Sequence, residues 1–274
     1  MDRRSFLRSA FAASAVVPVA GLAYGFAETG DVRIERVGVT VPNLPRSFDG
    51  LRVAFLTDIH HGPYVGLGDV RGFVRTALAL RPDLILLGGD YTLRDAKYIR
   101  PCFGVLASLK APLGVFGVLG NHDREYGAEA TERAMADAGI AGLVNAGVWL
   151  TRGADRLRLA GVDDLWRGRP DVAAALADTK PTEACLLVSH NPDVAETMTD
   201  RRVGLMLSGH THGGQVIAPG LTNPFIPSRY GDKYAHGLAD APTTRVYTSR
   251  GLGVTGLPVR YNCPPEITLL TLRC

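Results

Sequence analysis

The chain has 274 residues, of which 46% are apolar and 21% are charged, and it contains 32 glycines. This composition argues against a disordered, fibrous or multi-span membrane protein, and the length suits one large domain with a substantial buried core. The net charge of +3 falls to about +1 without the arginine-rich N-terminus, so the charge does not indicate a nucleic-acid partner.

Residues 1–29 have the pattern of a transport signal. The motif Arg3-Arg4-Ser5-Phe6-Leu7 precedes an apolar stretch of mostly small residues, 10–23. A twin arginine in this position is typical of a twin-arginine (Tat) signal, so we expect export by the Tat machinery to the periplasm or the outer face of the cytoplasmic membrane. Cleavage after Ala27 and a retained membrane anchor both fit the sequence, and an ordinary amphipathic helix is the alternative. The catalytic region would be residues 30–274.

The rest of the chain alternates between predicted strands and helices. Residues 32–37 alternate in polarity as an edge strand does. Short apolar runs that predict buried strands follow at 53–56, 84–87, 115–119, 186–188 and 205–207. Between the first two runs, residues 67–78 have the apolar spacing of an amphipathic helix. This order indicates βαβ units and an α/β fold, with further strands at 245–248 and 266–272.

Polar side chains follow each of the five apolar runs. In chain order they are Asp58 and His60, then Asp90, then Asn121 and His122, then His190, and finally His210 and His212. Ligands of open α/β sheets bind at the carboxyl ends of the strands. We therefore expect these side chains to meet at one edge of the fold.

The donor types in this set indicate a catalytic metal site. Asp58 with His60, and His210 with His212, are two residues apart, and in extended backbone such pairs face the same side. Carboxylate, imidazole and amide donors without thiolates disfavour a structural zinc site and suit catalytic Mn, Fe or Zn. Five of the seven histidines fall in these motifs, a concentration that scattered core histidines would not produce.

In this order, the motifs resemble those of the calcineurin-like metallophosphoesterases over about residues 51–272. They are Asp58-x-His60, Gly89-Asp90, Gly120-Asn121-His122-Asp123, His190 and Gly209-His210-Thr211-His212. The resemblance implies a four-layer αββα sandwich that hydrolyses phosphoesters with two divalent metal ions. It implies that Asp58, His60 and His212 hold one ion, that Asn121, His190 and His210 hold the other, and that Asp90 bridges them. Such a pair of ions can clamp the attacking and leaving oxygens of the transfer.

The resemblance also makes His122 the group that protonates the leaving oxygen or stabilises the phosphoryl group. Phosphoprotein phosphatases orient this histidine with an Asp three residues after the bridging Asp, whereas this chain has Leu93 there. This departure argues against protein phosphatase activity, and Asp123 is a candidate for the orienting group. We hypothesise that Arg94 and Arg250 contact the substrate phosphate, since guanidinium matches phosphate oxygens; ordinary surface arginines are the alternative.

The substrate class follows only from a resemblance. Gly213-Gly214-Gln215 and residues 249–253 look like the Tat-exported bacterial branch of the family. Some relatives of that branch are implicated in cleaving lipid-linked phosphoesters such as UDP-2,3-diacylglucosamine, a lipid A precursor. This implies phosphodiester or pyrophosphate substrates of the cell envelope and peripheral membrane contact. An exported phosphomonoesterase or nucleotidase is one alternative, and a catalytically silent metal-binding scaffold is another.

Overall fold

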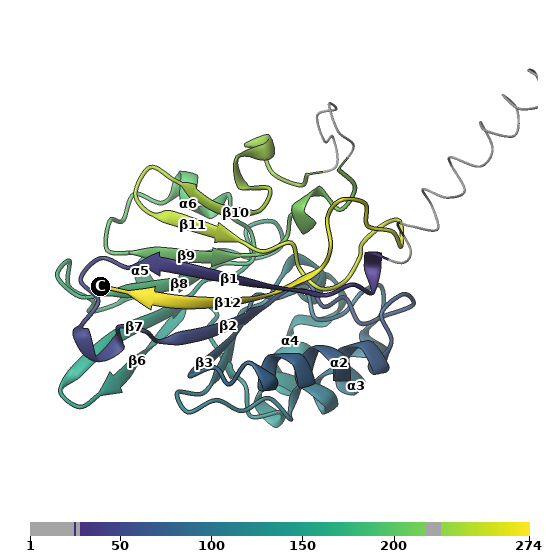
Figure 1. The fold of residues 1–274 in the computed structure, drawn as a ribbon, viewed down its shortest axis with the longest axis horizontal. Coiled ribbons are helices and arrows are strands. Elements are labelled where there is room, and N and C mark those ends of the chain that lie inside the picture. Colours follow the sequence, from purple (N-terminus) through teal and green to yellow (C-terminus); the bar gives the residue numbers. More distant parts are fainter. Residues whose placement is uncertain (1–24, 26–27, 218–225) are drawn as a thin grey trace, which may run out of the picture.

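The computed structural model describes residue 25, residues 28–217 and residues 226–274, and contains two six-stranded sheets (Figure 1). The first sheet has the order β1 (Arg33–Thr40), β12 (Glu266–Arg273), β2 (Arg52–Leu56), β3 (Leu84–Leu87), β4 (Val115–Gly117) and β5 (Ala141–Gly142). The second has the order β10 (Gly237–Asp240), β11 (Arg245–Thr248), β9 (Leu205–Ser208), β8 (Cys185–Val188), β7 (Asp155–Gly161) and β6 (Ala146–Arg152).

The centre of each sheet is parallel. Strands β2 to β5 are parallel to one another, as are β7, β8, β9 and β11. Strand β12 runs antiparallel to β2, so the carboxyl end of β2 lies away from the chain's C-terminus (Figure 1). Parallel strands buried on both faces need apolar side chains on both, which is why β2, β3 and β8 are almost continuous apolar runs.

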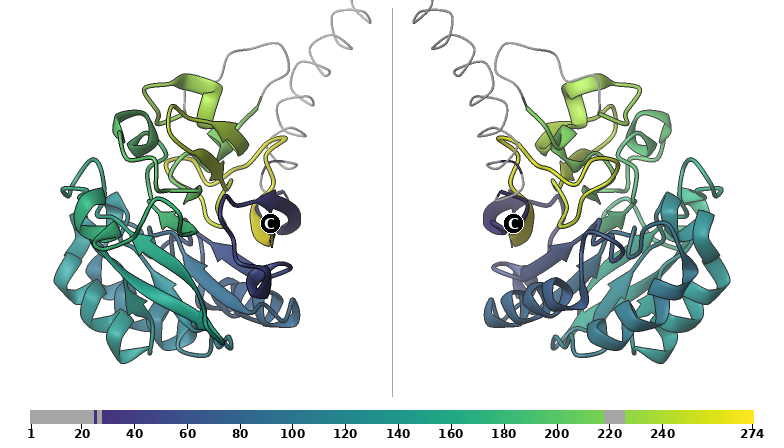
Figure 2. Two further views of the ribbon diagram at one scale, coloured as in Figure 1. Left: turned by 90° about the vertical axis from the view of Figure 1, so that its left-hand side faces the viewer. Right: turned by 90° about the vertical axis from the view of Figure 1, so that its right-hand side faces the viewer.

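Alternate side chains of the central strands feed two different cores. In β2, Val53 and Phe55 face the second sheet, where they join Leu159 and Leu186 in a core between the sheets. Helices cover the outer faces, which gives four layers in the order helix, sheet, sheet, helix, as the end-on views show (Figure 2). The predicted αββα sandwich is therefore confirmed.

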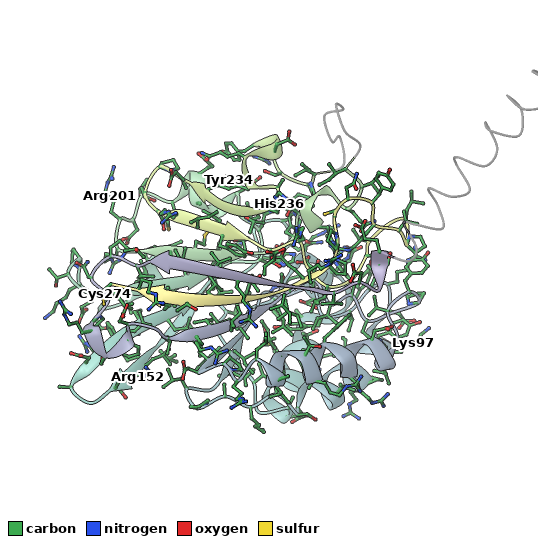
Figure 3. All side chains as sticks on the ribbon, viewed as in Figure 1. Lys97, Arg152, Arg201, Tyr234, His236 and Cys274 are labelled. Atoms are coloured by element: carbon green, nitrogen blue, oxygen red, sulfur yellow. The ribbon has the colours of Figure 1, made fainter. Side chains whose placement is uncertain are left out.

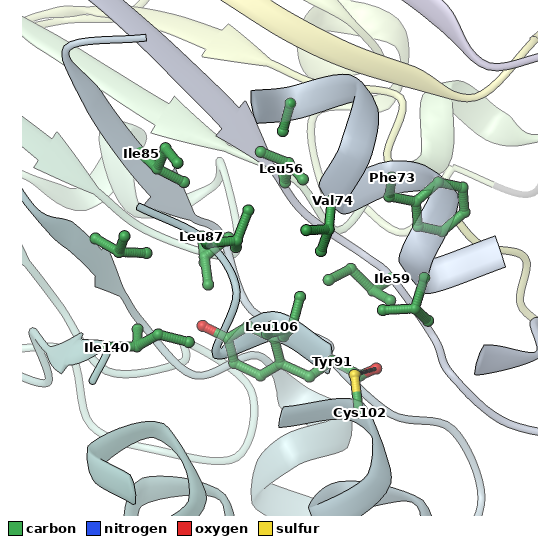
Figure 4. Packing of buried hydrophobic residues seen from close by; sticks show 14 of the residues in the cluster. Leu56, Ile59, Phe73, Val74, Ile85, Leu87, Tyr91, Cys102, Leu106 and Ile140 are labelled. Carbon is green, nitrogen blue, oxygen red and sulfur yellow. Dashed lines mark hydrogen bonds between the residues drawn. The ribbon is translucent and has the colours of Figure 1, made fainter. Parts of the chain in front are cut away.

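The longer helices all cover the first sheet. They are α2 (Leu67–Ala79), α3 (Ile99–Leu106) and α4 (Asn121–Asp137), whereas the short α5 (Val172–Leu176) and α6 (Val194–Thr197) cover the second sheet. Leu56 and Leu87 from the sheet pack here with Val74 of α2 and Leu106 of α3 (Figure 4). The structure also has single-turn 3-10 helices, η1 (Arg46–Phe48), η2 (Ala96–Tyr98), η3 (His212–Gly214) and η4 (Gly231–Tyr234).

The strands and the helix predicted from the sequence are present, with β1 as an edge strand paired to β12. Strands β5, β6, β7 and β10 were not predicted. Lys97 and Cys274 lie at opposite ends of the molecule (Figure 3), and the loops after β2 and β3 lie toward the end marked by Lys97. No helix within the described residues combines the length and apolar character needed to cross a membrane. The predicted signal lies almost wholly outside these residues.

Candidate metal centre

The carboxyl ends of five strands deliver the predicted ligands to one place. Loops after β2, β3, β8 and β9 carry six of them, and Asn121 begins α4 after β4. The seven side chains are at most 7% exposed: Asp58, His60, Asp90, Asn121, His190, His210 and His212. Such a concentration of buried polar groups is costly unless they are paired with each other or with bound cations.

The backbone that aims these side chains is not the extended one expected from the sequence. Asp58 and His60 have φ of 53° and 49°, and His210 and His212 have φ of 71° and 52°. Asp90 is also left-handed, with φ of 55°. Non-glycine residues rarely adopt this conformation, and a cluster of them is typical of functional sites. Asp58 and His60 do lie close together, with 3.8 Å between Oδ1 and Nε2, but left-handed backbone rather than strand alternation brings them there. The rings of His210 and His212 contact different histidines: His210 contacts His190, whereas His212 contacts His60.

Asp58, His60 and His212 form the first ligand group. Nε2 of His60 lies 3.1 Å from Nε2 of His212, and Oδ1 of Asp58 lies 3.4 Å from the latter atom and 3.8 Å from the former. Burial lowers the pKa of both His60 and His212 to about 3, and for His212 the neighbouring Arg260 adds to the effect. Both rings are therefore neutral at physiological pH, the form in which histidine binds metals.

The second ligand group surrounds His190. Its Nε2 lies 3.2 Å from Oδ2 of Asp90 and 3.2 Å from Nδ1 of His210. Its Nδ1 donates to the backbone carbonyl of Gly88 at 2.8 Å, an arrangement that fixes the ring and leaves Nε2 facing the cluster. Asn121 lies at the start of α4, next to His122, whose backbone N–H donates to Asp90.

Several atoms of the site fit bound cations. Oδ1 of Asn121 and Nε2 of His210 are buried without a hydrogen-bond partner among the described residues. Buried polar atoms are normally paired, so such orphans call for an explanation. Oδ2 of Asp90 faces both ligand groups, lying 3.6 Å from Nε2 of His60 and 3.2 Å from Nε2 of His190. These contacts place one carboxylate between the two ligand groups.

The charges of Asp90 and His190 depend on each other. Burial alone would raise the pKa of Asp90, but the charge of His190 and its hydrogen bond hold it well below the usual range. Burial opposes a charged His190, yet the carboxylate of Asp90 raises the pKa of His190 to about 10. Burial also raises the pKa of Asp58. The protein without metal therefore carries a proton on His190 at neutral pH.

His122 lies at the rim of the cluster. Its ring contacts that of His60 edge-on, with centroids 5.1 Å apart, and stacks on Tyr126 at 5.5 Å. The His122 side chain is 20% exposed, and its Nδ1 lies 4.0 Å from the carboxylate of Glu125. His122 can therefore meet a substrate that enters from solvent.

The suggestion that Asp123 orients His122 is wrong. The Asp123 carboxylate is fully buried and accepts hydrogen bonds from the backbone N–H groups of Gly120, Asp90 and Tyr91 at 2.7–3.0 Å. It thus joins the start of α4 to the loop that carries Asp90. Burial and the nearby Asp90 raise the pKa of Asp123 to about 8.

The two predicted substrate arginines differ in their surroundings. The guanidinium of Arg250 forms ion pairs with Glu35 and with Glu266, the latter at 2.7 Å, so its charge is already paired. This placement contradicts a free phosphate-binding role for Arg250. Arg94 is exposed and left-handed, with φ of 74°; its guanidinium contacts the Tyr64 hydroxyl and ring, and its backbone hydrogen-bonds to Tyr126. Arg94 stays a candidate.

Two residues at the site were not found from the sequence. Arg260 is fully buried, and its guanidinium lies 3.4 Å from Nδ1 of His212. Trp166 is 49% exposed and packs edge-on against the His210 ring, with centroids 4.3 Å apart. Neither residue belongs to a motif with a metal or catalytic pattern, so only the folded structure reveals them.

Comparison with known proteins agrees with this site. Residues 51–214 match the family described as calcineurin-like phosphoesterase. The uncharacterized metallophosphoesterase YkuE of Bacillus subtilis (strain 168) is 34% identical over 281 residues, covering 100% of this chain and 98% of the relative. Phosphodiesterase YaeI of Escherichia coli (strain K12) is 37% identical over 226 residues, covering 81% and 82%.

A solved structure shares the fold. The sulfate thiohydrolase SoxB of Thermus thermophilus superimposes with a TM-score of 0.52 at 14% identity, over 84% of this chain and 57% of SoxB. Fold, site and relatives together define a metal-dependent phosphoester hydrolase. The chain belongs to the calcineurin-like metallophosphoesterase family.

Proposed function

We propose that this protein hydrolyses phosphodiester or pyrophosphate bonds with two divalent metal ions. The observation that carries the proposal is the position of Oδ2 of Asp90, which faces the His60 group on one side and the His190 group on the other. Asp58, His60 and His212 would hold one ion, and Asn121, His190 and His210 the other. When bound, such ions act as Lewis acids and supply hydroxide at neutral pH. The donor set suits Mn, Fe or Zn.

The chain's own residues would orient the substrate and handle its proton. His122 is held by its backbone N–H bond to Asp90 and by the ring of Tyr126, and its side chain is 20% exposed. An imidazole in this place can protonate the oxygen of the leaving group as the phosphorus–oxygen bond breaks. Arg94 would contact the phosphate or its substituent.

The choice of diester over monoester draws on the relative named phosphodiesterase YaeI. Hydrolysis of bis-p-nitrophenyl phosphate and p-nitrophenyl phosphate with Mn²⁺ tests it, and we expect the higher kcat/KM with the diester. A large preference for the monoester would instead favour an exported phosphomonoesterase or nucleotidase. Fewer than two bound metal equivalents, with no activity after adding Mn²⁺ or Zn²⁺, would favour the silent scaffold.

A lipid-linked substrate is the finer part of the proposal. A pocket of about 430 Å³ opens beside the metal ligand His212 and is lined by apolar groups that include Val216, Pro227 and Leu257. Leu257 is 70% exposed, and a concave pocket lined mainly by apolar groups is typical of a site that binds apolar ligands. The pocket supports substrates that resemble UDP-2,3-diacylglucosamine, with peripheral membrane contact at this face.

Introducing a charge into this apolar pocket should affect a lipid-linked substrate but not a small diester. We expect Leu257→Asp to lower kcat/KM for UDP-2,3-diacylglucosamine while leaving bis-p-nitrophenyl phosphate hydrolysis within about twofold, because the small diester does not need the pocket. Ile34→Asp is the matched control, since Ile34 is 41% exposed on the edge strand β1. Equal losses for both substrates would remove the pocket from substrate binding.

We also propose Tat-dependent export, supported by the Arg3-Arg4-Ser5-Phe6-Leu7 motif. Replacing both arginines with lysine should keep the protein in the cytoplasm of a Tat-competent host. Export of this variant at the level of the unchanged chain would overturn the proposal. The mass of the exported protein shows whether the first residues are removed.

A further inference from the structure

Arg260 is the largest fully buried side chain among the described residues. It lies next to His212 of the first ligand group. Its guanidinium donates hydrogen bonds of 2.6–3.2 Å to four backbone carbonyls, those of Arg250, Gly251, Gly253 and Cys263. Among the described residues, no carboxylate forms an ion pair with it. A buried charge is costly unless it is hydrogen-bonded, and here four backbone carbonyls supply those bonds. Only a side chain with several N–H donors can bind all four carbonyls at once.

The carbonyls that bind Arg260 belong to a loop that packs on the first ligand group. The backbone N–H of Leu252 donates to the backbone carbonyl of Thr57 at 3.1 Å, and that of Gly253 donates to the backbone carbonyl of Asp58 at 2.6 Å. The approach is so close that a Cβ on Gly253 would lie 2.8 Å from the Cβ of His60. The loop therefore fixes the turn that presents Asp58 and His60, and Arg260 fixes the loop.

Arg260 also reaches the third member of the same ligand group. Its Nη2 lies 3.4 Å from Nδ1 of His212, on the side of the ring opposite the Nε2 that faces His60 and Asp58. The thiol of Cys263, whose carbonyl Arg260 binds, lies 3.2 Å from the carbonyl of His212. By contrast, within the described part of the chain Arg260 forms no hydrogen bond with the second group, whose His190 donates to the carbonyl of Gly88.

We propose that Arg260 is a positioning residue for the metal site of Asp58, His60 and His212, and not for the site of Asn121, His190 and His210. This inference rests on the proposed two-metal centre. The rigid planar fork of arginine suits the role because it offers five N–H donors, whereas lysine offers three from a single point. Loss of Arg260 would leave the carbonyls of the loop unpaired and loosen the turn at Asp58 and His60.

Metal binding to chelator-stripped protein tests the proposal without using activity. Equilibrium dialysis with Mn²⁺ should give two equivalents for the unchanged chain. In Arg260→Met we expect one equivalent to bind roughly 10–100-fold more weakly, the range for losing an outer-shell partner of a ligand. Arg158→Met is the matched control, because Arg158 is also buried but donates to the carbonyl of Ala175, outside the ligand loops. It should bind both equivalents as before.

Two backgrounds identify the affected site. His190→Ala disables the second site, so adding Arg260→Met should weaken the one remaining Mn²⁺ by the same factor. His60→Ala disables the first site, so adding Arg260→Met should leave the remaining affinity within about twofold, as expected for uncoupled changes. Equal weakening in both backgrounds, or in neither, would overturn the proposal.

The experiment separates three outcomes: a folding defect of the variant, failure of the two-metal proposal, and failure of the Arg260 proposal alone. If Arg260→Met does not fold, Arg260→Lys takes its place, with the same criterion of weakening confined to the His190→Ala background. If the unchanged chain binds fewer than two Mn²⁺, the two-metal proposal itself has failed. If it binds two and Arg260→Lys binds two with unchanged affinity, the role of Arg260 alone is rejected.

Discussion

The carboxylate of Asp123 accepts a hydrogen bond of 2.7 Å from the backbone N–H of Asp90. Asp90 is the carboxylate shared by the two ligand groups, and its backbone is left-handed. Asp123 also accepts from Tyr91 and Gly120, so one side chain ties the Asp90 loop to the first turn of α4, where Asn121 and His122 lie. Through the backbone, Asp123 thus connects the proposed bridging ligand Asp90, the proposed ligand Asn121 and the proposed acid His122.

Replacing Asp123 with Asn should weaken both the fold and the metal site. The amide NH₂ would face backbone donors that need an acceptor, so we expect the free energy of unfolding to fall by about 1–3 kcal/mol. Thermal unfolding and Mn²⁺ titration measure the two effects. Asp69→Asn is the matched control, because Asp69 caps α2 in the same way but is exposed and accepts its hydrogen bond from Gly66, not from the backbone of a predicted ligand. Equal changes of stability and Mn²⁺ affinity in the two variants would contradict the role of Asp123 in joining the Asp90 loop to α4.

His122→Ala should retain its metals and lose activity. A positioned acid typically contributes about 10²–10⁴-fold, so kcat should fall by that order for a substrate with an alkoxide leaving group. The loss should be much smaller for p-nitrophenyl esters, whose leaving group is stable without a proton. Comparing the two leaving groups at equal metal loading measures this difference. Identical losses for both would argue against acid catalysis by His122.

Arg250 and Arg94 should respond in opposite ways to replacement by Met. Arg250→Met leaves the buried Glu266 without its ion-pair partner, so we expect a stability loss of about 1–3 kcal/mol. Arg94→Met should raise KM with little change in stability, since the Arg94 side chain is exposed and its contact with Tyr64 is also at the surface. Steady-state kinetics and thermal unfolding of both variants measure these two effects. A raised KM for Arg250→Met at unchanged stability would restore it as a substrate contact.

Metal binding to the stripped protein should release protons near neutral pH. Asp90 raises the pKa of His190 to about 10, so the His190 ring is charged below that pH and must lose its proton to bind a metal. The apparent Mn²⁺ affinity should therefore increase as pH rises from 6 toward 9. Titration in weakly buffered indicator solution detects the protons. Proton uptake, or affinity that is independent of pH over this range, would contradict this charge state.

The fold was largely predictable because buried parallel strands leave a strong signal. Runs such as 84–87 are apolar on both faces, and the turn after each run carries a polar ligand. The hairpin of β6 and β7 was missed, although it forms an antiparallel ladder from Ala146 to Gly161. Its exposure pattern is mixed, so its sequence lacks the clear periodicity of the central strands.

The candidate ligands of the site could be predicted from the sequence, but the residues that hold them in place could not. Motif residues such as His190 and His212 are marked by residue type and by their place after a strand. Arg260 and Asp123 act on the ligands through backbone carbonyls and N–H groups, and such contacts carry no sequence pattern. The pairing of Arg250 with Glu35 joins residues 215 positions apart, which only the assembled sheets bring together.

The most direct test of the two-metal centre is anomalous diffraction from crystals grown with Mn²⁺. We predict two peaks about 3.5–4 Å apart on either side of Oδ2 of Asp90, one within reach of His60 and the other within reach of His190. A single peak, or peaks that do not share Asp90, would contradict the account.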